Sequence, residues 1–307
     1  MAIRIGIVGL GKVAHDQHLP VIAALDAFEL AATASRHGHV DGVPGYHDID
    51  EMLAARGDLE AVSLCQPPQA RFDAARQALD AGKHVFLEKP PGSSLGEVEL
   101  LREIATRRGL TLFASWHSRY APGVEPARGW LAGRTLRRVT VDWKEDVRRW
   151  HPGQAWIWRP GGLGVFDPGV NALSILTRIL PRGFRLVTAR LAFPSNRAAP
   201  VAADLSFRDL DGVPIEAVFD WRRTGPQTWD IRVQTDDGEL VLSRGGAELS
   251  LDGVKQPLGA EAEYRSLYLR FAELVGSGRS DVDVTPLRHV ADAFLRGERQ
   301  VAEPFED

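Results

Sequence analysis

The first fourteen residues constrain the fold more than any other part of this chain. Residues 3–8 form the short apolar run Ile-Arg-Ile-Gly-Ile-Val, and Gly9-x-Gly11-x-x-Ala14 follows directly. A buried strand that stops at glycines is how a dinucleotide-binding unit begins. Gly9 allows a tight turn, Gly11 lets the backbone approach a pyrophosphate, and the small Ala14 lets the next helix pack closely. A glycine triplet alone is common in turns, but this context predicts a phosphate site at a helix N-terminus.

Length and composition narrow the class of protein. The chain has 307 residues, which suggests two domains, and its 44% hydrophobic and 25% charged residues are ordinary for a globular protein. A net charge of −4, without long Lys or Arg runs, gives no reason to expect nucleic acid. No apolar stretch approaches the ~20 residues that span a bilayer, and the start lacks the features of a signal peptide. A single cysteine, Cys65, fits a reducing compartment, so we expect a cytoplasmic protein without a membrane partner.

The first 116 residues alternate between apolar segments and amphipathic or alanine-rich ones. We expect strands over 3–8, 28–34, 61–65, 84–88 and 110–115, and helices over 20–25, from 50, over 69–81 and over 95–108. This alternation predicts a parallel sheet covered on both faces. Ligands of such sheets bind at the carboxyl ends of the strands. The residues after Val8, Ala34, Cys65 and Leu87 should therefore gather around one crevice.

From about residue 135 the pattern becomes an alternation of apolar and polar residues. We expect strands over 137–147, 185–193, 201–209, 214–222, 228–235, 239–243 and 247–251, and helices over 167–180, 261–276 and from 285. The fold class is thus an α/β Rossmann domain (1–118) followed by an α+β domain (119–307) with a large, mostly antiparallel, open-faced sheet. We allow the final helix to pack back on the first domain. Because an uncovered sheet face often pairs with its copy, we expect a homodimer.

Glu88 and Lys89 stand at the end of a buried strand, on the edge where ligands bind. An ammonium group there, near a nicotinamide, could hydrogen-bond a substrate hydroxyl and favour its deprotonation. The alternative is an ordinary strand-end charge in solvent. The local sequence leaves both interpretations open.

Asp167 and Asn171 form a second candidate pair. Asp167 followed by a proline is typical of a helix N-cap and first helical position, and that role needs no catalysis. The two residues are also four apart, so both lie on one side of the first helical turns. A carboxylate and an amide beside a lysine would suit a polyol.

A third cluster lies between residues 143 and 158, which include four tryptophans. On the preceding strand an apolar face ends in Glu145, and a carboxylate there is either paired or lines a cavity. Aromatic faces against the C–H faces of a sugar are one use for the tryptophans, and packing on a hydrophobic surface is the other. For His151 a structural hydrogen bond is the simpler expectation. His15, His18 and Cys65 lack metal-ligand spacing, so we predict no metal.

The end of the second strand bears on the choice of cofactor. An NAD-specific unit usually places an acid there to bind the ribose 2′-hydroxyl. This chain instead reads Ala34-Ser35-Arg36-His37, with a guanidinium suited to phosphate. We therefore expect NADP to serve at least as well as NAD, unless Arg36 is only a solvated loop residue.

Four motifs, taken in order, resemble the glucose–fructose oxidoreductase/inositol dehydrogenase family. They are residues 9–14, 65–68, 88–90 and 167–171. Within that family, residues 116–122, 143–146, 150–158 and 162–169 resemble bacterial aldose 1-dehydrogenases that act on D-galactose and L-arabinose. The resemblance covers nearly the whole chain. It implies oxidation of the C1 hydroxyl of a pyranose to a lactone, with NAD(P) as cofactor and a monosaccharide as substrate.

The resemblance also implies roles for individual residues. The implied catalytic residues are Lys89, Asp167 and Asn171. The implied sugar-binding residues are His117, Glu145, Trp150, His151 and Trp229. The implied cofactor-binding residues are Gly9, Gly11, Lys12, Val13, Ser35, Arg36, Gln66, Pro67, Glu88 and Lys89.

One position departs from the family pattern, because many members carry histidine where Asn171 stands. Asparagine cannot act as an acid or base, so that duty would fall on Asp167 or Lys89. Two other functions are compatible with the same pocket. One is a glycoside hydrolase that retains its nicotinamide, and the other is a non-catalytic sugar or cofactor sensor.

Overall fold

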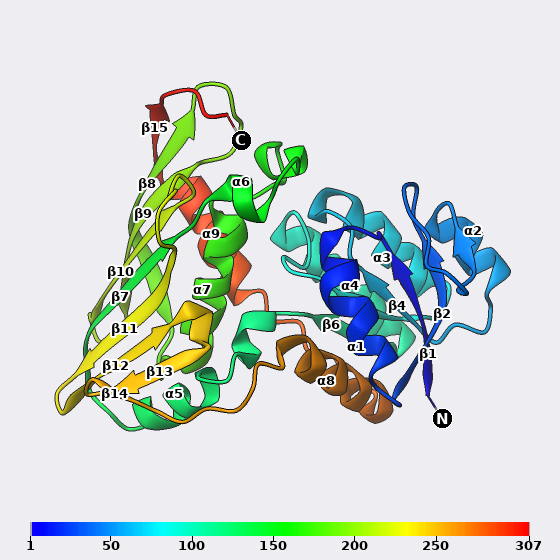
Figure 1. Ribbon diagram of the computed structural model, residues 1–307, viewed down its shortest axis with the longest axis horizontal. Helices are drawn as coiled ribbons and strands as arrows, with labels where there is room; N and C mark the ends of the chain where they lie inside the picture. Colours follow the sequence, from blue (N-terminus) through cyan, green and yellow to red (C-terminus); the bar gives the residue numbers. More distant parts are fainter. Residues whose placement is uncertain (1, 307) are drawn as a thin grey trace. The chain divides into compact units, whose positions relative to one another are not determined.

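The computed structural model describes residues 2–306, and these form two compact units (Figure 1). The first unit extends to His117 and also contains Tyr264–Val284, whereas the second contains Ser118–Glu263 and the residues from Thr285 onward. The sequence placed the boundary at 118 and assigned everything beyond it to the second domain. The difference lies in α8 (Glu263–Ser277), which belongs to the first unit. The final helix α9 (Thr285–Arg296) stays in the second.

The first unit is built on a six-stranded sheet in the order β3-β2-β1-β4-β5-β6. Its strands are β1 (Ile3–Val8), β2 (Phe28–Ala34), β3 (Gly45–Tyr46), β4 (Ala61–Leu64), β5 (His84–Leu87) and β6 (Leu112–Ala114). All pairings are parallel, which confirms the expected Rossmann-type sheet. The chain runs from β1 outward to β3, then returns to β4 on the other side of β1. Such a reversal of strand order opens a crevice at the carboxyl edge.

Helices and turns connect these strands. They are η1 (Ala14–His18), α1 (Leu19–Ala23), α2 (Ile49–Ala55), η2 (Pro68–Ala70), α3 (Arg71–Asp80), α4 (Leu95–Arg108) and η3 (His117–Tyr120). The first helix contains a π turn, at Ala14–His18. Asp48 and Ser94 cap α2 and α4 by accepting the N–H of Glu51 and Glu97. Polar caps of this kind fix where each helix starts.

Alternate residues of each strand face opposite sides of the sheet. On one side Val62, Leu64, Val85 and Leu87 join a core that includes Met52, Leu79 and Leu101 of α2, α3 and α4. On the other side Phe86 packs against Tyr268 and Phe271 of α8, with ring centroids 5.0 Å and 5.5 Å away. This aromatic layer explains why α8 belongs to the first unit.

The second unit is built on a nine-stranded sheet in the order β14-β13-β12-β11-β7-β10-β9-β8-β15. Its strands are β7 (Leu136–Lys144), β8 (Phe184–Pro194), β9 (Ala202–Asp209), β10 (Pro214–Asp220), β11 (Thr228–Thr235), β12 (Gly238–Ser243), β13 (Glu248–Leu251), β14 (Val254–Lys255) and β15 (Glu298–Ala302). The β7–β10 and β8–β15 pairs are parallel, and the others are antiparallel. The mostly antiparallel sheet is therefore confirmed.

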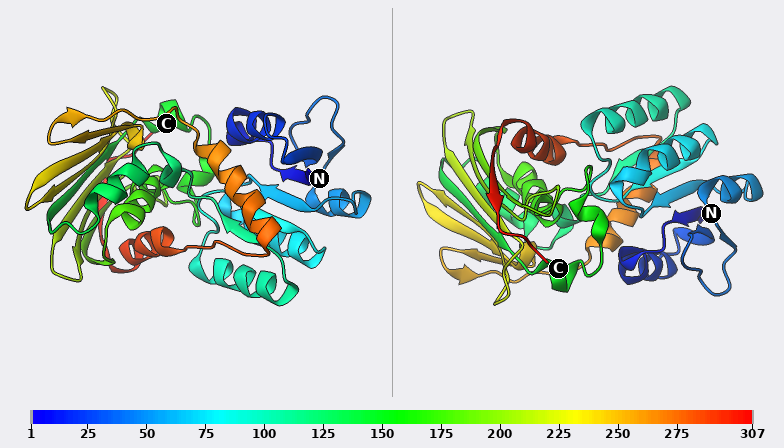
Figure 2. Two further views of the ribbon diagram at one scale, coloured as in Figure 1. Left: turned by 90° about the horizontal axis from the view of Figure 1, so that it is seen from below. Right: turned by 90° about the horizontal axis from the view of Figure 1, so that it is seen from above.

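The remaining helices of this unit lie on one face of the nine-stranded sheet (Figures 1 and 2). They include α5 (Val124–Leu131), α7 (Phe166–Ile179) and α9, and shorter turns are α6 (Val147–Trp150), η4 (Ala155–Trp158) and η5 (Arg244–Gly246). No helix within the described residues covers the opposite face, as the term open-faced requires. Across residues 2–306, every helix is too short or too polar to pass through a bilayer.

Candidate active site

The turn after β1 has the geometry that a dinucleotide needs. Gly9 has φ of +92°, and a Cβ there would lie only 2.9 Å from the backbone nitrogen of Gln66. A Cβ on Gly11 would meet nothing within 4 Å, so its backbone faces open space. The buried Gln66 Oε1 has no hydrogen-bond partner among the described residues. An open glycine turn beside an unsatisfied polar atom fits a bound dinucleotide.

The other cofactor candidates lie on the same carboxyl edge. Lys12 and Val13 open the first helix, and Lys12 forms an ion pair with Asp16. Ser35 and Arg36 follow β2, and the Ser35 N–H donates to the carbonyl of Tyr46 over 2.9 Å. Pro67 follows β4 and precedes η2.

Arg71 ties two of these loops together, and the sequence analysis missed it. Its side chain is 2% exposed, and the guanidinium donates to the carbonyl oxygens of Gln66, Glu88 and Pro90. A guanidinium has five donors in a rigid fork and stays charged when buried, so its two terminal nitrogens can bind three carbonyls at once. Arg71 therefore holds the loops after β4 and β5, which carry Gln66 and Lys89, in a fixed relation.

A buried polar network holds the Glu88–Lys89 turn from the other side. Glu88 Oε1 lies 3.3 Å from His18 Nε2 and accepts the Tyr264 hydroxyl over 2.7 Å. Glu88 Oε2 accepts the Lys89 N–H over 2.6 Å. The ring of His117 stacks on Tyr264 at 5.5 Å. The Glu88 carboxylate thus orients the backbone of Lys89 rather than facing solvent.

Charge explains why this carboxylate is ionised. Burial alone would raise the pKa of Glu88, but the hydrogen bond and charge of His18, with help from His117 and Tyr264, lower that pKa to about 2. Burial also opposes the charged form of His18, yet Cys65, Tyr268 and Glu88 around the ring raise the His18 pKa well above 6.5. At neutral pH the two residues therefore form a buried ion pair.

In the second unit, Glu145 follows directly on β7 and is 5% exposed. Its two oxygens accept the indole N–H groups of Trp221, over 3.1 Å, and Trp229, over 2.8 Å. Burial raises the pKa of Glu145 above its ordinary value, although the two indoles and His151 act in the opposite direction. Of the two alternatives that the sequence left open for this carboxylate, the structure shows pairing, with two tryptophans as donors.

His151 brings a second carboxylate to this cluster. Its Nε2 lies 3.5 Å from Asp167 Oδ2 and 3.9 Å from Glu145 Oε1. Its Nδ1 lies 3.3 Å from Gln154 Oε1, and its ring lies 5.3 Å from that of Trp221. Two carboxylates and an imidazole that converge in this way can hold several hydroxyl groups of one ligand.

An aromatic wall borders the cluster. The rings of Trp150 and Trp229 meet edge to face with centroids 5.5 Å apart. Gln227 Oε1 accepts the backbone N–H of Asp146 and lies 3.4 Å from Trp150 Nε1. Both tryptophans that the sequence analysis singled out are thus brought beside Glu145.

The structure corrects the interpretation of Asp167 as a helix N-cap. Helix α7 begins at Phe166, its N-cap is Val165, and no side chain caps it. The helix starts early because the Val165 N–H donates to the carbonyl of Pro200 over 2.8 Å, which fixes the preceding turn. Asp167 is the second helical residue, buried, and Asn171 lies one turn further along α7. The carboxylate is therefore available for chemistry rather than for capping.

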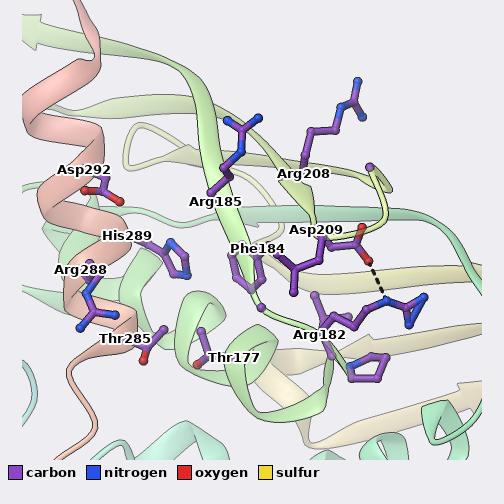
Figure 3. A pocket seen from close by; sticks show the side chains of 15 residues that line it. Thr177, Arg182, Phe184, Arg185, Arg208, Asp209, Thr285, Arg288, His289 and Asp292 are labelled. Carbon is purple, nitrogen blue, oxygen red and sulfur yellow. Dashed lines mark ion pairs between the residues drawn. The ribbon is translucent and has the colours of Figure 1, made fainter.

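A cavity of about 910 Å³ in the second unit lies elsewhere (Figure 3). None of the predicted site residues lines it. In Figure 3 Arg288 lies at one end, Arg182 beside Asp209 at the other, and Arg185 and Arg208 point away. Its charged groups do not converge, so it is not the candidate site.

One group of side chains among the described residues has metal-ligand spacing, namely His47, Asp48 and Glu51. The Asp48 carboxylate already caps α2, and Glu51 accepts the N–H of His47 over 3.1 Å. These bonds resemble a capping box, except that Glu51 accepts the N–H of the residue before the N-cap. The cluster is thus explained by the start of the helix.

The parallel sheet with its glycine turn has the architecture of a dinucleotide-binding domain, and the sheet of the second unit presents carboxylates and indoles. Comparison with known proteins agrees. Residues 3–115 match the model of the GFO/IDH/MocA family, described as an oxidoreductase family with an NAD-binding Rossmann fold. The chain is 47% identical to a galactose 1-dehydrogenase from Pseudomonas fluorescens over 307 residues, 99% of each chain. It therefore belongs to the GFO/IDH/MocA oxidoreductase family.

Solved structures show the same relationship. The crystal structure of a D-galactose 1-dehydrogenase from Rhizobium etli has 59% sequence identity and a TM-score of 0.95, over 99% of this chain and 98% of that one. A variant of a 3-ketoreductase from Actinomadura kijaniata, in complex with NADP and TDP-benzene, has a TM-score of 0.86 over 98% of this chain and 100% of that one. At 21% identity it shows only the shared fold.

The His18–Glu88 pair predicts how stability depends on pH. Because the folded pKa of His18 is raised, its contribution is complete below about pH 6.5 and declines as pH rises through the raised value. We expect the stability gap between the wild type and His18→Gln to be largest at pH 5.5–6.5 and to shrink by pH 9. Urea unfolding at each pH measures the gap. A gap that is constant from pH 5.5 to 9 would mean that folding does not raise the His18 pKa, and a gap that grows with pH would mean that the buried imidazole is neutral.

Proposed function

We propose that this protein is an NAD(P)-dependent aldose 1-dehydrogenase, which oxidises the C1 hydroxyl of a galactose- or arabinose-type pyranose to the aldonolactone. The convergence of Glu145, His151 and Asp167 beside the Trp150–Trp229 wall carries this proposal. Sequence identities of 47% and 59% to two galactose 1-dehydrogenases, each over 99% of this chain, support the choice of sugar.

The second unit supplies groups that suit a pyranose. Glu145 and His151 accept or donate hydrogen bonds to the hydroxyls away from C1. The indoles of Trp150 and Trp229 offer flat apolar faces to the C–H groups of the ring, while their N–H groups remain hydrogen-bonded. Because these polar partners are fixed by one another, we propose that they select the orientation of the sugar.

Oxidation at C1 must remove a hydride and a proton. The nicotinamide, when bound, accepts the hydride. We assign the proton to Asp167, and we assign to Lys89 a hydrogen bond to the C1 oxygen that stabilises its developing negative charge. Asn171 has no titratable proton, so its role is to bind a hydroxyl. The C1–O bond then becomes the lactone carbonyl.

The substrate is tested by incubating the purified protein with NADP and a panel of aldoses while following absorbance of reduced cofactor. D-galactose, D-fucose and L-arabinose should be good substrates, because they share the arrangement at C2 to C4. If D-glucose or D-xylose has a kcat/KM at least tenfold higher, about 1.4 kcal/mol in the transition state, the assignment of the sugar fails. Release of sugar from a glycoside without net reduction would indicate the hydrolase, and binding without turnover would indicate the sensor.

Asp167→Asn and Lys89→Ala should each lower kcat by roughly two orders of magnitude, which is the usual size of a general acid–base contribution. Cofactor affinity should hardly change in Asp167→Asn. Asp167→Asn is the sharper test, since Asp167 does not cap α7 and the amide keeps the shape of the carboxylate. Near-normal kcat in Asp167→Asn would move the role of base to Lys89.

We propose that NADP serves as cofactor at least as well as NAD. In this proposal Ser35 and Arg36 contact the 2′ position of the adenosine ribose. Arg36 is exposed after β2 and Ser35 is half-buried, as contacts with a 2′-phosphate would require. Ser35→Asp combined with Arg36→Ala should shift the ratio of kcat/KM values towards NAD, since a carboxylate binds the 2′-hydroxyl and repels the phosphate. If the ratio of kcat/KM values for NADP and NAD is unchanged, Arg36 does not contact the cofactor.

We also propose that the enzyme is cytoplasmic and forms a homodimer. The single cysteine supports the first point, and the sheet face left uncovered by helices supports the second.

A further inference from the structure

The residues that follow β15, up to the last described residue, Glu306, lie against the loop that carries His151. We define the C-terminal tail as residues 303–306 and the sugar loop as residues 147–158, which run from α6 to η4. Figure 1 shows the end of the chain beside α6, although the two segments are about 150 positions apart in the sequence. Both belong to the second unit.

The backbone of the tail is fixed by side chains that follow β8. β15 pairs with β8 up to Ala302, whose carbonyl accepts the Ser195 N–H over 3.1 Å. Asn196 then binds both backbone groups of Phe305, accepting its N–H over 3.0 Å and donating to its carbonyl over 3.2 Å. Arg197 Nε donates to the same carbonyl over 3.1 Å. The pairing of β15 with β8 is already complete at Ala302, so the bonds from Asn196 and Arg197 serve to fix the backbone of Phe305.

These bonds present the ring of Phe305 to both ends of the sugar loop. Its centroid lies 5.8 Å from that of Trp158, and the guanidinium of Arg148 lies 5.7 Å from it. The guanidinium of Arg197 in turn stacks over the Trp158 ring, 5.3 Å from its centroid. Aromatic and cation–π contacts of this kind hold the ring against both ends of the loop.

Trp158 links Phe305 to the candidate site. Its ring lies 5.3 Å from Trp221, whose N–H donates to Glu145 and whose ring borders His151. A series of contacts therefore connects Phe305 to the sugar-binding side chains. It passes through the indoles of Trp158 and Trp221 and ends at Glu145 and His151, which we assign to the sugar hydroxyls. A small shift of Trp158 would displace both.

We infer that Phe305 is a positioning residue for sugar binding: the tail holds the sugar loop so that Trp221, Glu145 and His151 keep the geometry that the substrate needs. This inference rests on the proposed function. It assigns no chemical step to Phe305, which contacts Trp158 and not the cluster itself. Because the displaced groups bind hydroxyls away from C1, their loss removes binding that the ground state and the transition state share, which raises KM with little change in kcat.

The test compares Phe305→Ala with Phe305→Tyr, which keeps the ring, and with Val301→Ala, whose side chain is 86% exposed on β15. We expect KM for D-galactose to rise about tenfold in Phe305→Ala, with kcat within about threefold and cofactor affinity unchanged. Phe305→Tyr and Val301→Ala should behave as the wild type. Backbone amides of the sugar loop should exchange hydrogen faster in Phe305→Ala only, whereas those of β7 and β10 should not change.

The two measurements separate the inference from the proposed function. If the wild type oxidises no aldose, the proposed function fails, and hydrogen exchange still tests whether the tail holds the loop. If the wild type is active but Phe305→Ala has unchanged KM and unchanged loop exchange, the inference is overturned. A uniform rise of exchange throughout the second unit would also overturn it, because Phe305 would then only add stability.

Discussion

The buried carboxylate of Glu145 is the constraint on which the second unit's site depends. At 5% exposure it would be strongly disfavoured without partners, and the N–H groups of Trp221 and Trp229 supply them. Each indole is thereby fixed at one end, and its remaining surface packs against His151 or Trp150. Removal of the carboxylate would leave two indole donors unpaired, so the cluster forms and fails as a unit.

The first unit uses the same principle at its own ligand edge. Arg71 and the His18–Glu88 pair are buried charges: Arg71 donates to carbonyl oxygens of the loops after β4 and β5, and Glu88 accepts the Lys89 N–H while it pairs with His18. Loops at the end of a sheet are normally its most variable part. Buried ionic groups that bind their backbone give Gln66 and Lys89 fixed places, which is what a cofactor and a reacting hydroxyl require.

Local patterns predicted most of the fold and the central site residues. Alternation placed most strands of both sheets within a few residues, although β3, β14 and β15 were not expected, and Glu145 was expected to be paired or to line a cavity because an apolar strand face ends there. The sequence analysis missed Arg71, Trp221 and Phe305, since their roles arise from contacts between distant segments. Asp167-Pro168 looked like a cap because the carbonyl that accepts the Val165 N–H and starts α7 earlier belongs to Pro200, 35 positions further along the chain. Helix α8 was assigned to the wrong unit for the same reason.

The central claim is that a hydride leaves C1 of the sugar for a cofactor that is then released. D-galactose carrying deuterium at C1 tests it most directly, with NADP in excess and mass spectrometry of both products. The account predicts that the reduced cofactor gains one deuterium and that the aldonolactone contains none. Deuterium that remains in the sugar, with no labelled reduced cofactor in solution, would contradict the account.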